Sequence, residues 1–347
     1  MTLLARLHLD TPLIQAPMAG VSTPVMAAEV SNAGALGSIG IGAVDAKHAQ
    51  VMIAELRERC SQAFNVNVFC HQPAVADATR ESRWLQQLRP QFAQFAAQAP
   101  SQLNEIYRSF LTDDEMLALL IATPPRVLSF HFGVPDSARM QLLRAANIVL
   151  IASVTSLAEG RIAEAAGVDA VVAQGYEAGG HRGVFDPDGR DDRLGTFALT
   201  RILVRHLSVP VIAAGGIMDG AGIAAALRLG AVAAQLGTAF IACPESAADG
   251  GYRSALSSEA AHHTVMTRVI SGRPARCLAN RFTAWGENID ESEVPAYPVA
   301  YDAGKALNAA ARHAGDFGYG AQWAGQGAPL ARSIPAAQLV RLLAQEM

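Results

Sequence analysis

The sequence predicts a (β/α)8, or TIM, barrel, and its strand spacing is the first observation in favour of this fold class. Short apolar runs typical of buried strands alternate with stretches of helical period along the chain. Such runs begin at Val127, Ile148, Ala170, Val211 and Val232, in steps of 21, 22, 41 and 21 residues. Repeated steps of similar size are typical of parallel βα units. The length of 347 residues also suits one barrel of about 250 residues with insertions.

Three runs upstream complete a set of eight strands. Pro12–Pro17 is expected to form the first strand, Ala35–Ile39 the second and Phe64–Val68 the third. Proline and glycine just after the first strand should end it before a helix near Pro24–Asn32. The chain contains neither G-x-G-x-x-G nor a P-loop, so the motifs do not support a Rossmann fold.

Two segments are longer than a strand-to-strand connection requires. We therefore expect residues 1–243 to form the barrel with a helical insertion at about 71–125, residues 244–333 to form a lid over a substrate pocket, and residues 334–347 to supply the closing barrel helix. Both long segments follow the carboxyl ends of strands, where barrels of this class place their active sites. They should form the walls and lid of that site.

The composition excludes several classes of partner. A net charge of -4 without long runs of one sign argues against a nucleic-acid surface or a polybasic membrane patch. No apolar run approaches the ~20 residues that span a bilayer. The apolar stretch within residues 1–8 is too short for a secretory signal and is interrupted early by a charge, which favours a cytoplasmic protein. The four cysteines form no C-x-x-C pair, and no metal site is expected. A homo-oligomer is left open.

A glycine-rich turn around one histidine follows the strand that begins at Ala170. His181 lies among Gly175, Gly179, Gly180 and Gly183, so backbone free of side chains surrounds a group that can take a proton near neutral pH. A solvated turn is the simpler interpretation of one such motif. Two more strand-plus-glycine elements downstream favour a functional site.

Those two elements follow the seventh and eighth expected strands. Gly215-Gly216 ends Val211–Ala214, and Gly237-Thr238 follows Gln235-Leu236. Barrels of this type often bind a phosphate on these two loops through backbone N–H groups. The sequence therefore predicts a phosphate-bearing ligand.

Five motifs together resemble class I of the nitronate monooxygenase family, once called 2-nitropropane dioxygenases. The motifs run in order from the first strand almost to the last helix, and the set is more specific than any one member. They are Gln15–Gly20 (QAPMAG), Asn67–His71 (NVFCH), Ser129–Gly133 (SFHFG), Gln174–Gly183 and Tyr319–Gln326 (YGAQWAGQ).

The resemblance implies a non-covalent FMN. Its phosphate would lie on Gly216 and Gly237-Thr238, with Gly215, Gln235 and Leu236 in the same two elements. Ala16, Pro17 and Met18 would approach the ring, and polar or backbone contacts would come from Asn67, Gln174, Gly179 and Gly180. A flat isoalloxazine needs amide groups at its pyrimidine edge and small residues where backbone comes close.

The resemblance also implies that His181 is the catalytic residue. It would act as a base on a neutral nitroalkane, or hold the anion when a nitronate arrives already ionised; the sequence leaves both roles open. Tyr297, Tyr301 and Lys305 are spaced to share one side of a helix with Pro298 in its first turn, and this spacing alone favours an exposed amphipathic face. The resemblance instead implies that these three residues line the pocket entrance, with Tyr107 and Tyr252 as further candidates. His131 is either a core residue or a pocket wall.

The expected function is oxidation of an alkyl nitronate, propionate 3-nitronate above all, with O2 to a carbonyl compound and nitrite. An NAD(P)H-dependent FMN reductase on the same barrel, acting on an enoyl thioester or a quinone, is the alternative enzyme. A non-catalytic flavin-binding module is a third possibility. Barrels of the IMP dehydrogenase type need a cysteine in a catalytic loop, and none of the four cysteines lies in one.

Overall fold

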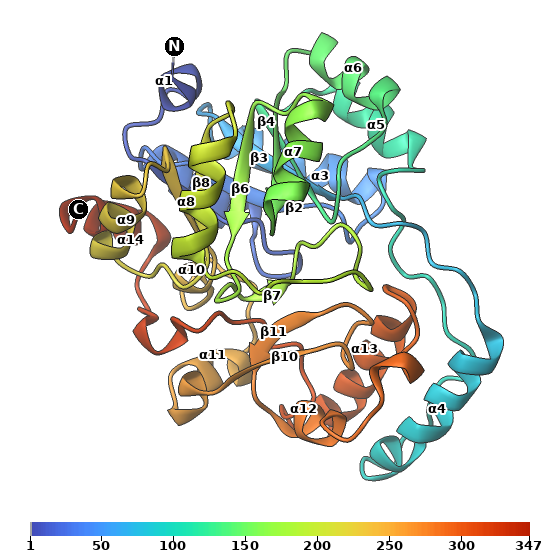
Figure 1. The fold of residues 1–347 in the computed structure, drawn as a ribbon. Coiled ribbons are helices and arrows are strands. Elements are labelled where there is room, and N and C mark those ends of the chain that lie inside the picture. The colour runs from blue at the N-terminus through green and yellow to red at the C-terminus, as the bar shows by residue number, and fades with distance from the viewer. Residues whose placement is uncertain (1) are drawn as a thin grey trace.

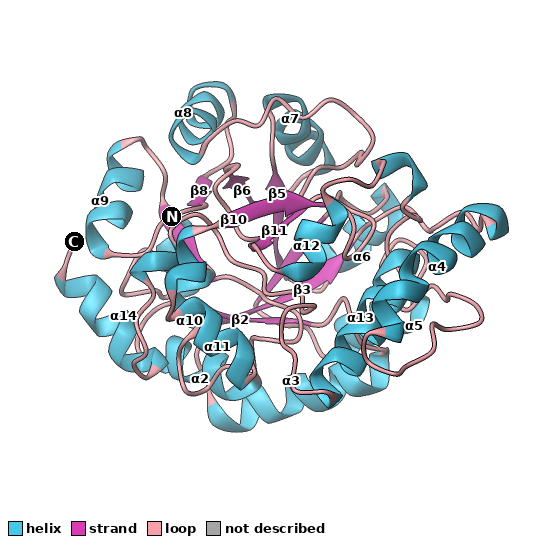
Figure 2. Ribbon diagram, turned by 90° about the horizontal axis from the view of Figure 1, so that it is seen from below, coloured by secondary structure: helices cyan, strands magenta, loops and turns pink. Residues whose placement is uncertain are grey.

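The computed structural model describes residues 2–347, and Met1, where the expected barrel segment begins, lies outside the described residues. Eight parallel strands form a ring with helices around it (Figures 1 and 2), which confirms the predicted fold class. All eight strands overlap the runs expected from the sequence. They are β1 (Leu13–Gln15), β2 (Gly37–Gly40), β3 (Phe64–Phe69), β4 (Val127–His131), β5 (Val149–Val154), β6 (Ala170–Gln174), β8 (Val211–Ala214) and β9 (Ala233–Leu236).

The ring follows the order β1-β9-β8-β6-β5-β4-β3-β2 and closes between its two ends. Ile14 pairs with Leu36 in a parallel bridge beside β2. The Gln15 N–H donates to the Leu36 carbonyl at 2.9 Å, and the Leu36 N–H donates to the Leu13 carbonyl at 3.0 Å. Closure removes both sheet edges, and the carboxyl ends of all eight strands meet at one mouth.

Ten helices belong to the barrel body. Gly37 shows how closely they pack, because a Cβ there would lie 1.9 Å from the Ala27 carbonyl oxygen. The short first helix packs Leu3 and Leu7 against strand residues such as Val127 and Val149. The helices are α1 (Leu3–Leu7), α2 (Pro24–Asn32), α3 (Ala46–Arg59), α5 (Asp114–Ala122), α6 (Ser137–Ala145), α7 (Leu157–Ala166), α8 (Thr196–His206), α9 (Gly220–Arg228), α10 (Thr238–Ile241) and α14 (Ala336–Gln345).

Apart from α5, which belongs to the barrel body, the two long segments pack together beside one mouth of the barrel, below it in Figure 1. Trp84 and Leu88 from the first segment share an apolar core with Phe282 and Leu307 from the second. The helical elements are α4 (Ala78–Ala93), α11 (Gly250–Leu256), α12 (Arg281–Gly286), α13 (Val299–His313) and the short 3-10 turns Glu259–His262, Glu291–Glu293 and Ala328–Leu330. We call this unit the lid.

A small antiparallel sheet in the lid was not expected from the sequence. It has the order β10-β11-β7, where β10 is Thr264–Thr267, β11 is Ala275–Leu278 and β7 is Gly180–His181. These strands have two to four residues each, which is too short for a clear alternation of apolar and polar side chains. Through them the lid is hydrogen-bonded to the turn that carries His181.

The helix expected from Tyr297 begins two residues later than predicted. α13 starts at Val299, so Tyr297 and Pro298 precede it, while Tyr301 and Lys305 lie on it one turn apart. Among residues 2–347, no helix is both long enough and apolar enough to cross a membrane.

Candidate active site

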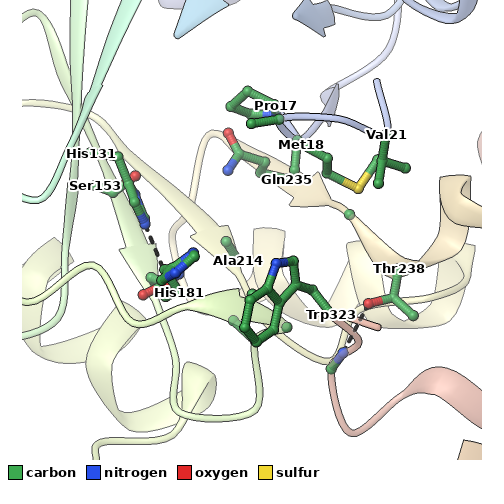
Figure 3. A pocket seen from close by; sticks show the side chains of 18 of the residues that line it. Pro17, Met18, Val21, His131, Ser153, His181, Ala214, Gln235, Thr238 and Trp323 are labelled. Carbon is green, nitrogen blue, oxygen red and sulfur yellow. Dashed lines mark hydrogen bonds between the residues drawn. The ribbon is translucent and has the colours of Figure 1, made fainter. Parts of the chain in front are cut away.

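A cavity lies between the carboxyl ends of the barrel strands and the lid, and we call it the inner cavity (Figure 3). Most of the residues singled out from the sequence line it. They are Ala16, Pro17, Met18, Asn67, His131, Gln174, Gly179, Gly180, His181, Gly215, Gly216, Gln235, Gly237, Thr238, Tyr297 and Tyr301, with Tyr107 and Tyr252. Leu236 is not among the lining residues, because its side chain packs in the barrel core. Lys305 is not among them either.

Two glycine loops form one end of the inner cavity. Gly215 and Gly216 adopt φ values of +120° and +70°, a region that side chains disfavour. The N–H groups of Gly216, Gly237 and Thr238 have no hydrogen-bond partner elsewhere in the described chain. Unpaired N–H groups on two adjacent loops suit an anionic group such as a phosphate.

Residues 323–327 cross these loops as a strap. The Gly325 N–H donates to Thr238 Oγ1 at 3.0 Å, a bond drawn in Figure 3. A Cβ at Gly179 would lie 2.4 Å from the Gly325 nitrogen, and one at Gly327 would lie 2.8 Å from the Gly216 carbonyl oxygen. The strap touches the loops backbone to backbone, so these glycines are required for close approach.

The side-chain amides of Asn67 and Gln174 form hydrogen bonds within the wall of the cavity. Asn67 donates through Nδ2 to the Ser129 carbonyl at 3.0 Å and to its hydroxyl at 2.9 Å. Gln174 donates to the His181 carbonyl at 3.0 Å and accepts from the Gly183 N–H at 2.7 Å. Gln174 therefore holds the histidine turn in place.

His181 is fixed at both its backbone and its ring. Its carbonyl also accepts a bond from His131 Nε2 at 3.1 Å, drawn in Figure 3, and its own Nε2 lies 2.9 Å from Ser271 Oγ. Nδ1 has no bond to any described residue and is not among the buried unpartnered atoms, so it faces the cavity. One nitrogen is thus anchored and the other is available to a ligand.

Aromatic rings surround the His181 imidazole. The ring centroids of Trp323, Tyr297, Phe132 and Tyr301 lie 4.9, 5.3, 5.7 and 6.0 Å from its own. These rings lower the polarity around the imidazole, and an electrostatic interaction is stronger where less water surrounds it.

Burial keeps three neighbouring histidines neutral. Burial, helped by the nearby charge of Arg273, lowers the pKa of His71 to about 4. Burial also lowers the pKa of His131 to about 4 and the pKa of His181 well below its usual value. The free imidazole of His181 is therefore neutral at pH 7 and can accept a proton, but its pKa does not lie near neutrality as the sequence suggested.

The Arg182 side chain, next to His181 in sequence, points away from the cavity. Its buried guanidinium lies 2.9 Å from the Asp191 carboxylate and donates to the Gln174 carbonyl. Arg182 extends the line of β7, since its N–H donates to the Pro274 carbonyl at 2.8 Å, and successive side chains of an extended segment lie on opposite faces. Asp191 belongs to the acidic loop at 186–193.

Lys305 lines a second, outer cavity that adjoins the inner one. Its Nζ lies 4.8 Å from the ring centroid of Tyr107 and 5.4 Å from that of Tyr301, and burial lowers its pKa. Tyr107, Tyr301 and Trp323 line both cavities. The lysine therefore stands behind the aromatic residues that separate the two spaces.

Several residues of the site were missed or given no role. Phe132 and Trp323 stand in the quoted motifs, but nothing in their spacing marked them as walls of the cavity. Ser271 and Arg273 come from a lid loop with no recognisable motif, and only the fold brings them near His181.

Comparison with known proteins gives a consistent result. A family model described as Nitronate monooxygenase matches residues 1–346. Nitronate monooxygenases from Paraburkholderia phytofirmans and Pseudomonas aeruginosa are 60% and 51% identical, covering 99% and 98% of this chain and 94% and 97% of theirs. The solved nitroalkane oxidase from Streptomyces ansochromogenes has a TM-score of 0.90 at 41% identity, covering 98% of this chain and 96% of its own. FabK from Thermotoga maritima has a TM-score of 0.73 at 31% identity, over 99% and 94%.

Proposed function

Because this chain belongs to the nitronate monooxygenase family, we propose that it binds a non-covalent FMN in the inner cavity and oxidises propionate 3-nitronate there. The protein is an enzyme, a flavin-dependent oxidoreductase that acts on nitronates. The flavin would be FMN, the substrate propionate 3-nitronate and the oxidant O2. Carbon–nitrogen cleavage would then release a carbonyl compound and nitrite.

The chemistry of the cavity suits FMN. The unpaired N–H groups of Gly216, Gly237 and Thr238 would hold its phosphate, and Gly216 has a φ of +70°, which a residue with a β-carbon disfavours. Ala16, Pro17 and Met18 offer a backbone wall with one flexible apolar side chain. Pro17 and Met18 lie across the cavity from His181 in Figure 3. When bound, the flavin supplies the electron transfer between substrate and oxygen.

The chain's own residues would bind, orient and deprotonate. His181 presents Nδ1 to the cavity and can remove the α-proton from a neutral nitroalkane. For a substrate that arrives as the anion, the same neutral ring can donate one hydrogen bond from Nδ1 if Ser271 donates to Nε2. Lys305 would meet the carboxylate of propionate 3-nitronate from the outer cavity.

The observation that carries the proposal is the aromatic enclosure of His181, with four ring centroids within 6.0 Å. A small substrate matches that enclosure. The likeness to FabK keeps a reductase as the second candidate, supported at lower identity and TM-score than the nitroalkane oxidase.

One anaerobic experiment separates the two functions. The flavin of the purified holoenzyme would be followed by absorbance while propionate 3-nitronate or NADH is added. Reduction by the nitronate and none by NADH supports the proposal, and the reverse supports a reductase. The flavin released by heat should have the mass of FMN.

A further inference from the structure

Arg273 is a buried cation that carries no carboxylate partner. Only 3% of the residue is exposed. One guanidinium nitrogen donates to the Val184 carbonyl, while the buried Nε has no hydrogen-bond partner. None of the ion pairs among residues 2–347 includes Arg273. Burying an unpaired charge is costly, so this arginine needs an explanation.

The position of the guanidinium supplies that explanation. Its central carbon lies 4.2 Å from the ring centroid of Phe132, and Phe132 lines the inner cavity. One aromatic ring therefore separates the charge from the space beside His181. The cavity lining itself contains no lysine, arginine, aspartate or glutamate.

We propose that the positive charge of Arg273 attracts the nitronate anion into the inner cavity, which is itself lined by uncharged groups. Arg273 would act from behind Phe132 and would not touch the substrate. This inference rests on the proposed function, since it requires an anionic substrate. In the dry interior the attraction is weakly screened and acts through the Phe132 ring without direct contact. Lys305, in the outer cavity, would serve the second charge of a dianion.

The backbone around Arg273 holds the charge in place. Gly272 has a φ of +91°, and a Cβ there would lie 2.4 Å from the Pro295 carbonyl oxygen and 2.6 Å from the Tyr297 nitrogen. Ser271 is fully buried and bonded to His181. Three consecutive residues thus contact the segment before α13, the catalytic histidine and the Phe132 wall.

The charge of Arg273 also bears on the surrounding titratable groups. Together with burial, which is the larger cause, it lowers the pKa values of His71, His131 and His181. It opposes burial at Tyr297, whose pKa is raised chiefly by that burial. A purely structural donor to the Val184 carbonyl would need no charge, because a glutamine amide can make the same kind of bond at a lower desolvation cost.

The test compares Arg273→Lys with Arg273→Gln in the holoenzyme, since both side chains can donate a hydrogen bond and only the lysine is charged. Binding of nitrite, a small anionic probe, and of 2-methyl-2-nitropropane, a neutral nitro compound without an α-proton to remove, would be measured by perturbation of the flavin absorbance. We expect Arg273→Gln to weaken nitrite about tenfold or more, a loss of ~1.4 kcal/mol, with 2-methyl-2-nitropropane changed less than about twofold. Arg273→Lys should stay within about threefold of the wild type for both.

A control variant, Arg253→Gln, removes a guanidinium that donates to the carbonyls of Ala242, Ser246 and Ala248, away from the inner cavity, and should leave nitrite binding unchanged. Equal loss of both ligands in Arg273→Gln, or an equal nitrite loss in the two Arg273 variants, would show a structural role and overturn the proposal. If Arg273→Gln does not fold, the ratio of the nitrite to the 2-methyl-2-nitropropane dissociation constant is compared between pH 7 and pH 11 in Arg273→Lys and in the wild type, whose arginine stays charged: a ratio that changes no more in Arg273→Lys than in the wild type overturns the proposal. Nitronate turnover by the wild type tests the proposed function separately.

Discussion

His181 and Ser271, which are 90 residues apart in sequence, are joined by a hydrogen bond of 2.9 Å between Nε2 and Oγ. The bond links the barrel turn after β6 to the lid loop before β11. It anchors one ring nitrogen and turns the other toward the inner cavity. The catalytic geometry therefore depends on the lid as well as on the barrel.

Ser271→Ala should lower kcat for neutral nitroalkanes about tenfold. A net contribution of ~1 kcal/mol from one hydrogen bond, together with a freer imidazole, accounts for that magnitude. KM and flavin content should change little, because Ser271 touches neither substrate nor cofactor. Ser271→Thr keeps the hydroxyl and should recover most of the rate. If steady-state kinetics gave wild-type values for both variants, Ser271 would have no part in positioning the His181 imidazole.

His181→Asn should slow neutral nitroalkanes far more than nitronates prepared in advance. A general base contributes ~10²- to 10⁴-fold, and an ionised substrate does not need one. The comparison is of kcat/KM for nitroethane and for ethyl nitronate. Similar losses on the two forms would show that the ring acts on the anion instead of removing a proton.

Gly216→Val should purify without flavin. Gly216 adopts a φ of +70°, and a β-carbon there meets Glu177 Cβ at 3.3 Å beside the unpaired N–H groups. Gly315 is a matched control because it has a φ of +78° and nothing within 4 Å of an added Cβ, so Gly315→Val imposes backbone strain away from the cavity. Full flavin occupancy in Gly216→Val would mean that the phosphate binds elsewhere.

Lys305→Met should lower kcat/KM for propionate 3-nitronate and leave ethyl nitronate nearly unchanged. Only the first substrate has a carboxylate for the lysine to meet, and a loss of about tenfold is expected for one partly exposed charge. Arg312→Met is the control, since Arg312 also lies on α13 and lines the outer cavity but is paired with Asp249 at 3.4 Å. An equal fall in kcat/KM for both substrates would show that Lys305 supports the fold or flavin binding and does not contact the carboxylate.

The buried histidines predict loss of stability in acid. The pKa values of His71 and His131 are lowered to about 4 from 6.5, so between pH 6.5 and 4 the unfolded chain binds protons that the folded protein does not. The free energy of unfolding must then fall as pH drops through that window. Within residues 2–347, neither buried ring nitrogen of His71 has a hydrogen-bond partner, so His71→Met should fold and lose less stability between pH 7 and 5.

Denaturant titrations at the two pH values would measure this difference. His313→Met, at an exposed position on α13, is the control and should behave like the wild type. An equal loss in His71→Met and in the wild type would show that His71 is not responsible.

The barrel could be predicted because its strands are buried apolar runs at regular spacing, and because glycine loops follow strands at fixed places. The glycines of the site and His181 could be predicted as well, because they stand in these loops directly after strands. The lid could not be predicted in detail. Its strands are short and partly polar, and Ser271 and Arg273 acquire their meaning only from contacts with distant residues.

Two features of the site depend on geometry that local sequence does not show. The pKa of His181 was expected near neutrality, but the rings of Phe132, Tyr297 and Trp323 bury it. Arg182 follows His181 in sequence, yet its side chain meets Asp191 and not the cavity. Neither the burial of a side chain by a lid nor its direction beside a two-residue strand can be read from local sequence.

The central claim is that this enzyme oxidises a nitronate with oxygen and needs no nicotinamide cofactor. The most direct measurement follows O2 uptake and nitrite release together, with propionate 3-nitronate as the substrate and no NAD(P)H present. The account predicts that both occur, and that His181→Asn retains them better on the nitronate than on 3-nitropropionate. No O2 uptake and no nitrite from the nitronate, in holoenzyme that instead oxidises NADH in the presence of a quinone or an enoyl thioester, would contradict it.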